Sequence, residues 1–530
     1  LKNVYSDQQM NISWDISGTA PNDESLAEEM REMEVWDWMA YRDSSRSSVL
    51  QTWMALEGVE NRNDWRAARR NETTSALGVM GGYAALRETL QMQLITPLEG
   101  ASAARTISVS SIEGVQVKAH PYEEMLDGKP GGQLALAELA PVDHLFVYLA
   151  QPEALLPILD NGADFISELG GTLTGNRIKY NLEQRYLARM GLSEEWLRLF
   201  LKSGGVKECA VLLPDLFLLD GTDLTVVARL SKPALIKPLL ATVGVDVLSG
   251  GRSRTQTDAG ECFWAFQDDL LMVSTRASEL DRVLALHKNG GEGSLGKSAE
   301  FRYMLTQLPL SEPTRAYAYC SDPFIRKLVS PETKIGQLRR VRAMEKLTVL
   351  TSGALLAEQD GFGRIQSIEE LKTKGYLPET IEIDPAEYSL EPDLTARSAT
   401  YGTLANLVAI DAVPVDLVTA AEAEAYATYV ENYSRYWRQF FDPIALRLND
   451  GPDGTMEAEL FILPLIDSSI YQMVREVVAS REDQVPMRVP TFSPEPVLQF
   501  SANLKDTVWR LVTEGLSEIL TQYWDVDSAI

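Results

Sequence analysis

The residues with the most specific spacing for chemistry lie at Gly291–Ser298, which reads GEGSLGKS. This octapeptide matches the phosphate-loop pattern GxxxxGK[ST], in which backbone N–H groups surround phosphates, the lysine contacts them and the hydroxyl binds magnesium. Such a loop follows a strand and opens a helix. The preceding residues, Ser278–Lys288, have the pattern of a helix instead, and no apolar strand ends in an obvious magnesium-binding Asp. We therefore interpret the match as coincidental. The nucleotide-enzyme hypothesis depends on a strand ending at Gly291.

The three histidines, His120, His144 and His287, do not follow the spacing of a metal site. The chain contains no HExxH, CxxC or GxSxG motif. Asn449–Gly454 (NDGPDG) resembles the start of a calcium loop, but its twelfth position is Leu460 rather than Glu. We predict no catalytic, cofactor-binding or metal-ligating residue. We expect His144, at the start of a strand, to be structural.

Carboxylate chemistry is compatible with this sequence, because Asp and Glu are abundant. The adjacent pairs Glu123-Glu124, Asp268-Asp269 and Glu369-Glu370 look like residues of turns or of helix surfaces. A catalytic pair formed between distant segments remains open, since such partners meet only in the folded chain.

One segment, Thr419–Phe441, carries aromatic residues at helical spacing. Thr419 and Glu422 form a capping-box pattern at its start, and Asp442-Pro443 marks its end. The stripe consists of Tyr426, Tyr429, Tyr433, Tyr436, Trp437, Phe440 and Phe441. We predict that it packs against a sheet, with Tyr433, Trp437 and Phe440 buried. A sugar- or partner-binding stripe is the alternative.

A repeated pattern must position these residues: a short apolar strand, then Ser, Asp or Pro, then an amphipathic helix. It occurs at Leu145–Leu159, Leu224–Leu240, Leu271–Leu286, Ala316–Val329, Ala458–Val478 and Val497–Val512. We expect the strands of the first four units to lie in one sheet, with their helices covering one face.

Two hairpin patterns favour antiparallel pairing. Leu213–Arg229 contains Asp220-Gly221 between apolar runs, and Cys262–Ser274 turns at Asp268-Asp269. The predicted fold class is therefore α+β, with repeated strand–helix units forming antiparallel or mixed sheets covered by helices, rather than a doubly wound parallel sheet.

The pattern divides the 530 residues into four regions. They are an N-terminal helical region at 1–105, an α+β domain at 106–350, a linker or extended loop at 351–400, and a second α+β region with the aromatic helix at 401–530. The alternating residues 106–120 predict strands. Within the Gly- and Pro-rich linker we expect one short helix, at Ser367–Lys374.

Composition narrows the class of protein further. A net charge of −27 disfavours binding to nucleic acid or to anionic lipid. No apolar run is long enough to cross a bilayer. The cysteines, Cys209, Cys262 and Cys320, are too few for a disulfide-based fold. We expect buried, inert thiols, with a bridge between two of them left open.

Several phrases together resemble a group of large, uncharacterised bacterial exported proteins of planctomycete-like lineages. They are VKAHPYEEM at Val117–Met125, LAPVDHLFVY at Leu139–Tyr148, PDLFLLDGTDLTVV at Pro214–Val227, SDPFIRKLVSP at Ser321–Pro331 with Arg339-Arg340, SATYGT at Ser398–Thr403, YWRQFFDPIALRL at Tyr436–Leu448 and LPLIDSS at Leu463–Ser469. The resemblance covers about residues 105–480 and carries no known activity. It implies residence in the cell envelope, with a leader or anchor absent from this chain.

These observations predict a non-enzymatic binding or scaffolding protein of the cell envelope, part of a larger assembly, with a protein partner or self-assembly and no cofactor. The expected location is extracytoplasmic, with the cytoplasm as the alternative. The alternative function is an extracytoplasmic hydrolase that acts on glycan through paired carboxylates. That reaction requires two carboxylates about 5–10 Å apart in a cleft.

Overall fold

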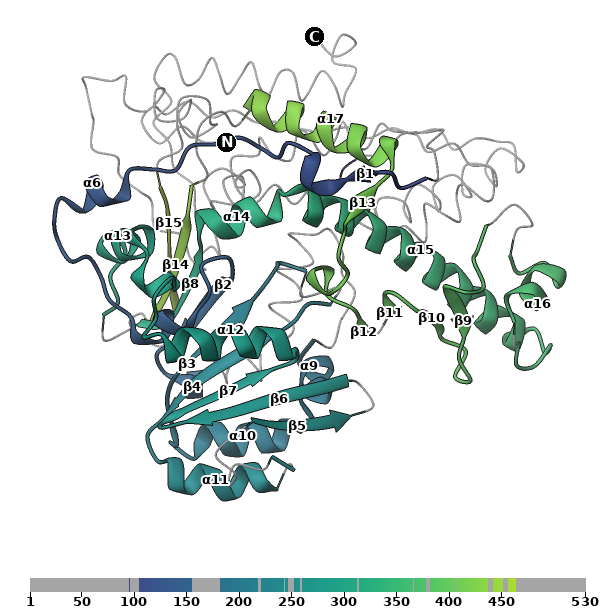
Figure 1. The fold of residues 1–530 in the computed structure, drawn as a ribbon. Coiled ribbons are helices and arrows are strands. Elements are labelled where there is room, and N and C mark those ends of the chain that lie inside the picture. The colour runs from purple at the N-terminus through teal and green to yellow at the C-terminus, as the bar shows by residue number, and fades with distance from the viewer. Residues whose placement is uncertain are drawn as a thin grey trace, which may run out of the picture.

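The protein is represented by a computed structural model (Figure 1). The structure describes residues 95, 104–154, 182–217, 221–242, 244–245, 252–257, 260–311, 314–365, 367–377, 382–404, 406–436, 442–450 and 456–463. Apart from residues 95, 104 and 105, the predicted N-terminal helical region therefore lies outside the described residues, and so does the last repeat unit.

Among the described residues, nine strands form one antiparallel sheet in the order β15-β14-β8-β2-β3-β4-β7-β6-β5. The strands are β2 (Leu145–Leu149), β3 (Val206–Leu213), β4 (Thr225–Leu230), β5 (Arg252–Thr257), β6 (Gly260–Gln267), β7 (Leu270–Ser274), β8 (Thr314–Cys320), β14 (Ile444–Asp450) and β15 (Met456–Ile462). The α+β fold class and the placement of the first four repeat strands in one sheet are confirmed. The hairpin at Asp268-Asp269 joins β6 to β7, with Asp268 at φ 53°.

Helices cover both faces of this sheet, so the expectation that they cover one face is wrong. On one face lie α12 (Ala277–Lys288), α13 (Ala299–Gln307) and the 3-10 helix η2 (Ala135–Leu139). On the other lie α10 (Glu194–Lys202) and α11 (Pro233–Ala241). Strand β7 gives the physical reason. All five of its residues, LLMVS, are buried, so both faces of the strand need apolar cover.

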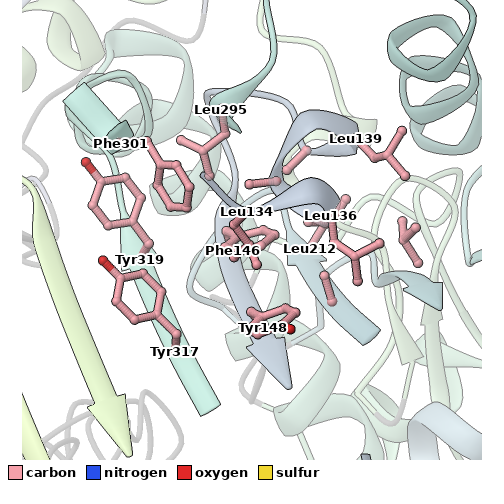
Figure 2. Packing of buried hydrophobic residues seen from close by; sticks show 14 of the residues in the cluster. Leu134, Leu136, Leu139, Phe146, Tyr148, Leu212, Leu295, Phe301, Tyr317 and Tyr319 are labelled. Carbon is pink, nitrogen blue, oxygen red and sulfur yellow. The ribbon is translucent and has the colours of Figure 1, made fainter. Parts of the chain in front are cut away.

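The larger core is built around Phe301 of α13 (Figure 2). Its ring meets those of Phe146, Tyr317 and Tyr319 edge-on, with centroids 5.8, 6.3 and 5.0 Å apart. All four side chains are fully buried. Edge-to-face pairs add about 0.5–1.5 kcal/mol each to the free energy of burial. Phe301 of the covering helix α13 therefore packs against both strands of the pair β2–β8.

The 29-residue helix α15 (Pro331–Gln359) leaves the sheet and carries a small lobe at its far end (Figure 1). Ser330 caps its first turn by accepting a hydrogen bond from the N–H of Thr333, and Pro331 occupies the first turn. The lobe contains α16 (Ile368–Thr373) and the strands β9 (Tyr388–Leu390), β10 (Ala396–Ser398), β11 (Gly402–Thr403) and β12 (Asn406–Leu407).

The lobe differs from the linker that we expected at 351–400. The first residues of the expected linker, 351–359, belong to α15. The lobe and the adjoining part of α15 share a core that includes Leu350, Leu371, Tyr388 and Leu407. The predicted short helix is present as α16. Strands of two or three residues are too short to produce a periodic pattern, which is why the sequence resembles a loop here.

Arg340 joins α15 to the sheet and to the lobe. Its guanidinium is buried, donates to the carbonyl oxygens of Gly221 (2.6 Å) and Val408 (3.3 Å), and lies over the ring of Phe217. Gly221 has φ 134°, and a Cβ there would lie 2.8 Å from the oxygen of Leu407. The glycine of the predicted Asp220-Gly221 turn thus permits close approach to the lobe, within the connection between the antiparallel strands β3 and β4.

The aromatic helix is α17 (Ala420–Tyr436). Its capping box is confirmed: the N–H of Thr419 donates to Oε2 of Glu422, and the N–H of Glu422 donates to Oγ1 of Thr419. Tyr426 and Tyr429 are buried, in agreement with a core role. The Tyr433 side chain, Trp437 and Phe440 lie outside the described residues.

The expected second α+β region, 401–530, does not build a separate sheet from its described strands, because β14 pairs with β8 of the first region. The segment 106–120, expected to form strands, contributes only β1 (Ile107–Ser108), which pairs with β13 (Leu417–Val418). The other elements are α6 (Tyr122–Leu126), α9 (Leu182–Met190), α14 (Asp322–Leu328), and the 3-10 helices η1 (Val109–Ser111), η3 (Pro152–Ala154), η5 (Leu295–Lys297) and η6 (Ile410–Ala412).

No helix in the described ranges is long and apolar enough to span a membrane.

The three cysteines provide a test of this core. All are free and buried, on β3, β6 and β8, and burial raises the pKa of each thiol to about 12. Because the thiolate is the reactive species, we expect essentially no modification of the native protein by a thiol reagent at pH 8. All three should react in guanidinium chloride. Rapid modification of any of them without denaturant would contradict this packing.

Candidate functional site

Polar side chains gather at one end of the nine-stranded sheet. In an antiparallel sheet the start of one strand lies beside the end of its neighbour. Here β2, β4 and β14 begin where β3, β7 and β8 end. We call this set the sheet-end residues. It consists of Asp143, His144, Asp215, Thr222, Asp223, Ser274, Thr275, Arg276, Ser321, Asp322 and Asp442.

His144 lies between two carboxylates. Its Nδ1 is 3.1 Å from Asp143 and its Nε2 is 2.8 Å from Glu279 of α12, and Arg282 contacts both acids. Each nitrogen of the His144 ring therefore lies against a carboxylate oxygen. Burial acts to raise the pKa of Asp143 and of Glu279. The hydrogen bonds from His144 and the nearby cations outweigh burial, and both pKa values are lowered.

Asp223 forms a second group. Its carboxylate accepts hydrogen bonds from Arg189 (3.3 Å), Arg276 (3.3 Å) and the hydroxyl of Thr275 (3.1 Å). Nearby, burial raises the pKa of Asp215 to about 6, although Arg340 acts to lower it. These contacts connect α9, β4 and β7 at the same end of the sheet.

The third group holds three carboxylates, from Glu300, Asp322 and Asp442, and we call it the carboxylate group. Oε1 of Glu300 accepts hydrogen bonds from the hydroxyl of Tyr319 (2.6 Å) and from the N–H of Asp322 (3.0 Å). Arg326 pairs with Asp322, and His120 lies 2.8 Å from Oδ1 of Asp442.

Burial dominates the electrostatics of the carboxylate group. It raises the pKa of Glu300 to about 7, with the charge of Asp322 adding to the effect. It also raises the pKa of Asp322 against the opposing effect of Arg326, and that of Asp442 against the hydrogen bond from His120. Burial therefore raises the pKa of all three carboxyl groups above their ordinary values.

A raised pKa within a group of carboxyl side chains occurs in acid–base sites, and it also occurs in structural networks. The exposed fractions of Glu300, Asp322 and Asp442 are 8, 3 and 4%. Buried carboxylates whose oxygens are engaged by the chain's own donors leave little surface for a substrate. The geometry therefore favours a structural role for this group, and the glycan-hydrolase alternative stays a prediction.

The phosphate-loop match joins helix to helix. Helix α12 ends at Lys288, and η5 and α13 follow the motif, so the strand that the nucleotide-enzyme hypothesis requires is not there. The glycines instead permit packing on η2. A Cβ at Gly296 would lie 2.6 Å from the nitrogen of Glu138, and the N–H of Leu295 donates to the oxygen of Ala140. Lys297 is exposed.

The paired acids occupy the positions that the sequence indicates. Glu123 and Glu124 lie in the first turn of α6, Asp268 and Asp269 form the β6–β7 turn, and Glu369 and Glu370 lie in the first turn of α16. His144 has the structural surroundings we expected, and His287 lies in the last turn of α12. Asn449 is part of β14, and the rest of NDGPDG extends beyond the described residues except for Asp450.

The carboxylate group itself was missed. Its members, at positions 300, 322 and 442, and their partner His120 are far apart in the chain, and no spacing in the sequence connects them. Among the described residues, no cluster of three or more His, Cys, Asp or Glu side chains is arranged to hold a metal ion.

Comparison with protein-family models, with curated proteins and with solved structures finds no match to this chain. The resemblance to bacterial exported proteins therefore stays a prediction.

The role of GEGSLGKS can be tested with two substitutions. Gly296→Ala places a methyl group against the backbone of η2 and should cost about 1–3 kcal/mol of stability, as overpacked cores do. Lys297→Ala removes an exposed side chain and should leave the melting temperature unchanged. A phosphate loop would instead lose micromolar nucleotide affinity in Lys297→Ala, and calorimetric detection of such affinity would reject the packing role.

The pairing of His144 can be tested through Glu279. Glu279→Gln keeps an acceptor but removes the charge, which should cost about 1.5–3 kcal/mol at pH 7. Because the fold lowers the pKa of Glu279, this stabilisation is present above the ordinary value of 4.5 and is lost as the pH falls through the lowered value. The melting-temperature difference from wild type should therefore shrink in acid. Glu292→Gln, on an exposed turn, is the control.

Proposed function

We propose that this protein is a non-enzymatic binding or scaffolding protein that works in a larger assembly, and that its lobe contacts the partner. The observation that carries the proposal is a set of three exposed apolar side chains, close together in the sequence at the end of α15. It consists of Leu355, Leu356 and Phe362, which are 50, 40 and 54% exposed. We call these three residues the lobe patch.

The lobe patch stands on a packed base. The Phe362 ring meets Tyr376 edge-on at 5.9 Å, and the ammonium of Lys374 lies 5.0 Å from the same ring. Beneath the helix, Ala354 and Ala357 are fully buried in the lobe core. Large apolar side chains held in place by a core lose little conformational freedom when a partner covers them, which favours binding.

The charges of the molecule support the same function. The sheet-end acids are buried, except for the half-buried Asp143, and they are engaged by His, Arg or backbone donors, so they contribute to the integrity of the sheet. The net charge of −27 opposes contact with nucleic acid or anionic lipid. A protein surface with an apolar centre and basic residues is the partner that this chemistry fits best.

We place the proposed assembly outside the cytoplasm, in the bacterial cell envelope. The support for this location is the sequence resemblance described above, and the cytoplasm is the alternative.

The lobe patch can be tested by Leu355→Ser combined with Phe362→Ser. We expect the double variant to show at least a tenfold weaker yield of crosslinked partner complex. If the protein associates with itself, we expect light scattering to show at least a tenfold weaker self-association. Both sites are exposed, so the melting temperature should change little. Leu199→Ser is the matched control, because Leu199 is 58% exposed on α10, far from the lobe (Figure 1). Equal loss in the control, or none in the double variant, would reject the proposal.

A further inference from the structure

The outer edge of β5 is an unpaired side of the nine-stranded sheet. In the part of the chain that the structure describes, β5 pairs with β6 on one side and with no strand on the other (Figure 1). All six residues of β5, RSRTQT, are exposed or half-buried. Such an edge presents a row of backbone donors and acceptors, with which an extended segment of another chain can pair.

The hairpins determine which backbone groups of β5 point outward. The residues that close a two-residue hairpin exchange both of their backbone hydrogen bonds, and the alternation continues along the strands from there. Thr257 and Gly260 close the β5–β6 hairpin, so every second residue, counted back from Thr257, bonds to β6. The β6–β7 hairpin leads to the same alternation. The other residues of β5, Arg252, Arg254 and Gln256, therefore point their N–H and C=O groups away from the sheet.

Strand β5 lacks most of the features that protect a free edge. Protected edges carry a proline, a bulge or charged side chains, or they are very short. Strand β5 is six residues long and contains no proline, and its register with β6 runs from Arg252 to Thr257 without a shift. Its protection comes from charge alone, and that charge belongs to two arginines. The edge is therefore regular enough to accept a full strand.

The arginines determine which kind of strand fits. The side chains of Arg252 and Arg254 are 57 and 58% exposed, and β5 contains no acid. Each arginine pairs with one carboxylate of this chain, that of Asp281 on α12 or of Glu261 on β6. Because a guanidinium has five N–H donors, it can also bind a second carboxylate. Opposite charges on adjoining strands stabilise their pairing, so an acidic strand fits this edge.

A second copy of β5 fits the same edge poorly. Antiparallel pairing of two such edges, centred on the outward-pointing residues, would place Arg254 opposite the same arginine of the other copy, and like charges in that position destabilise the pairing. The net charge of −27 acts against an acidic segment at long range. At physiological ionic strength, however, exposed charges more than about 8 Å apart are largely screened, so the nearby arginines dominate.

We propose that the outer edge of β5 binds an extended, acidic segment of a partner protein, which adds to the sheet as a further strand. The segment lies antiparallel to β5, as do all neighbouring strands of this sheet. Two of its acids, spaced two residues apart, face Arg252 and Arg254. Its backbone pairs with these arginines and with Gln256. This site is separate from the lobe patch and does not depend on the function proposed for the lobe.

The probe for this site is a fluorescent peptide of alternating threonine and glutamate, about eight residues long, which as a strand carries all its acids on one face. We expect saturable binding to the full-length protein in fluorescence anisotropy. The same peptide with lysine in place of glutamate should bind about tenfold more weakly, because its charges face the arginines.

Two substitutions at one position separate the backbone from the side chain. Gln256→Pro removes an outward N–H and leaves the hydrogen bonds between β5 and β6 in place, so it should weaken binding of the glutamate peptide about tenfold. Gln256→Thr is the matched control, which keeps the N–H and should bind like the wild type. Both variants lose the contact between Gln256 and Arg254.

Hydrogen exchange locates the contact in the wild-type protein and does not depend on the folding of a variant. The amides of Arg254 and Gln256 should exchange faster than that of Thr255 in the free protein, and the glutamate peptide should slow both. Outward amides that are already protected, equal binding of the lysine peptide, or no binding at millimolar peptide would each overturn the proposal. A wild-type dimer that Gln256→Pro dissociates in sedimentation would also overturn it, because a second copy would then occupy the edge.

Discussion

The buried guanidinium of Arg340 is the interaction on which the arrangement of the described parts depends. Burial of this charge on α15 costs desolvation energy. The guanidinium offsets that cost by donating hydrogen bonds to the backbone oxygens of Gly221 and Val408, and the ring of Phe217 packs against its face. Those oxygens belong to the connection before β4 and to the segment after β12. One side chain therefore fixes the sheet, the long helix and the lobe relative to one another. Lysine would not serve, because its single ammonium lacks the planar, forked set of donors.

Charged groups are also paired at the sheet end, but there the groups that need partners are acids. A nine-stranded antiparallel sheet brings strand starts and strand ends to one edge, where the backbone turns and polar residues are common. Here the acids meet His144, Arg189, Arg276 and Arg326 from segments far apart in the chain. Only the carboxylate group has more acids than bases. Burial raises the pKa of Glu300 to about 7, and the charge of Asp322 adds to this effect.

Local patterns predicted local structure well. The strands β2, β4, β7 and β8, the β6–β7 turn at Asp268-Asp269 and the capping box at Thr419 each depend on neighbouring residues, and all are present. What failed depends on distant residues. Cover on both sheet faces, the lobe in place of a linker, and the pairing of β14 with β8 are set by tertiary packing. The carboxylate group joins His120 to Asp442, 322 positions apart, so no window of sequence contains it.

The length of α15 has a mechanical consequence. Arg340 is about one third of the way along the helix, and Gln359 lies 19 residues further on, which at about 1.5 Å per residue is about 28 Å. With Arg340 as the pivot, the part of α15 beyond it, about two thirds of the helix, is a lever arm with the lobe toward its end. A tilt of a few degrees at the pivot would swing the tip by about 2–3 Å over that length. Small changes in packing at the sheet are thus geometrically amplified where the lobe faces its surroundings.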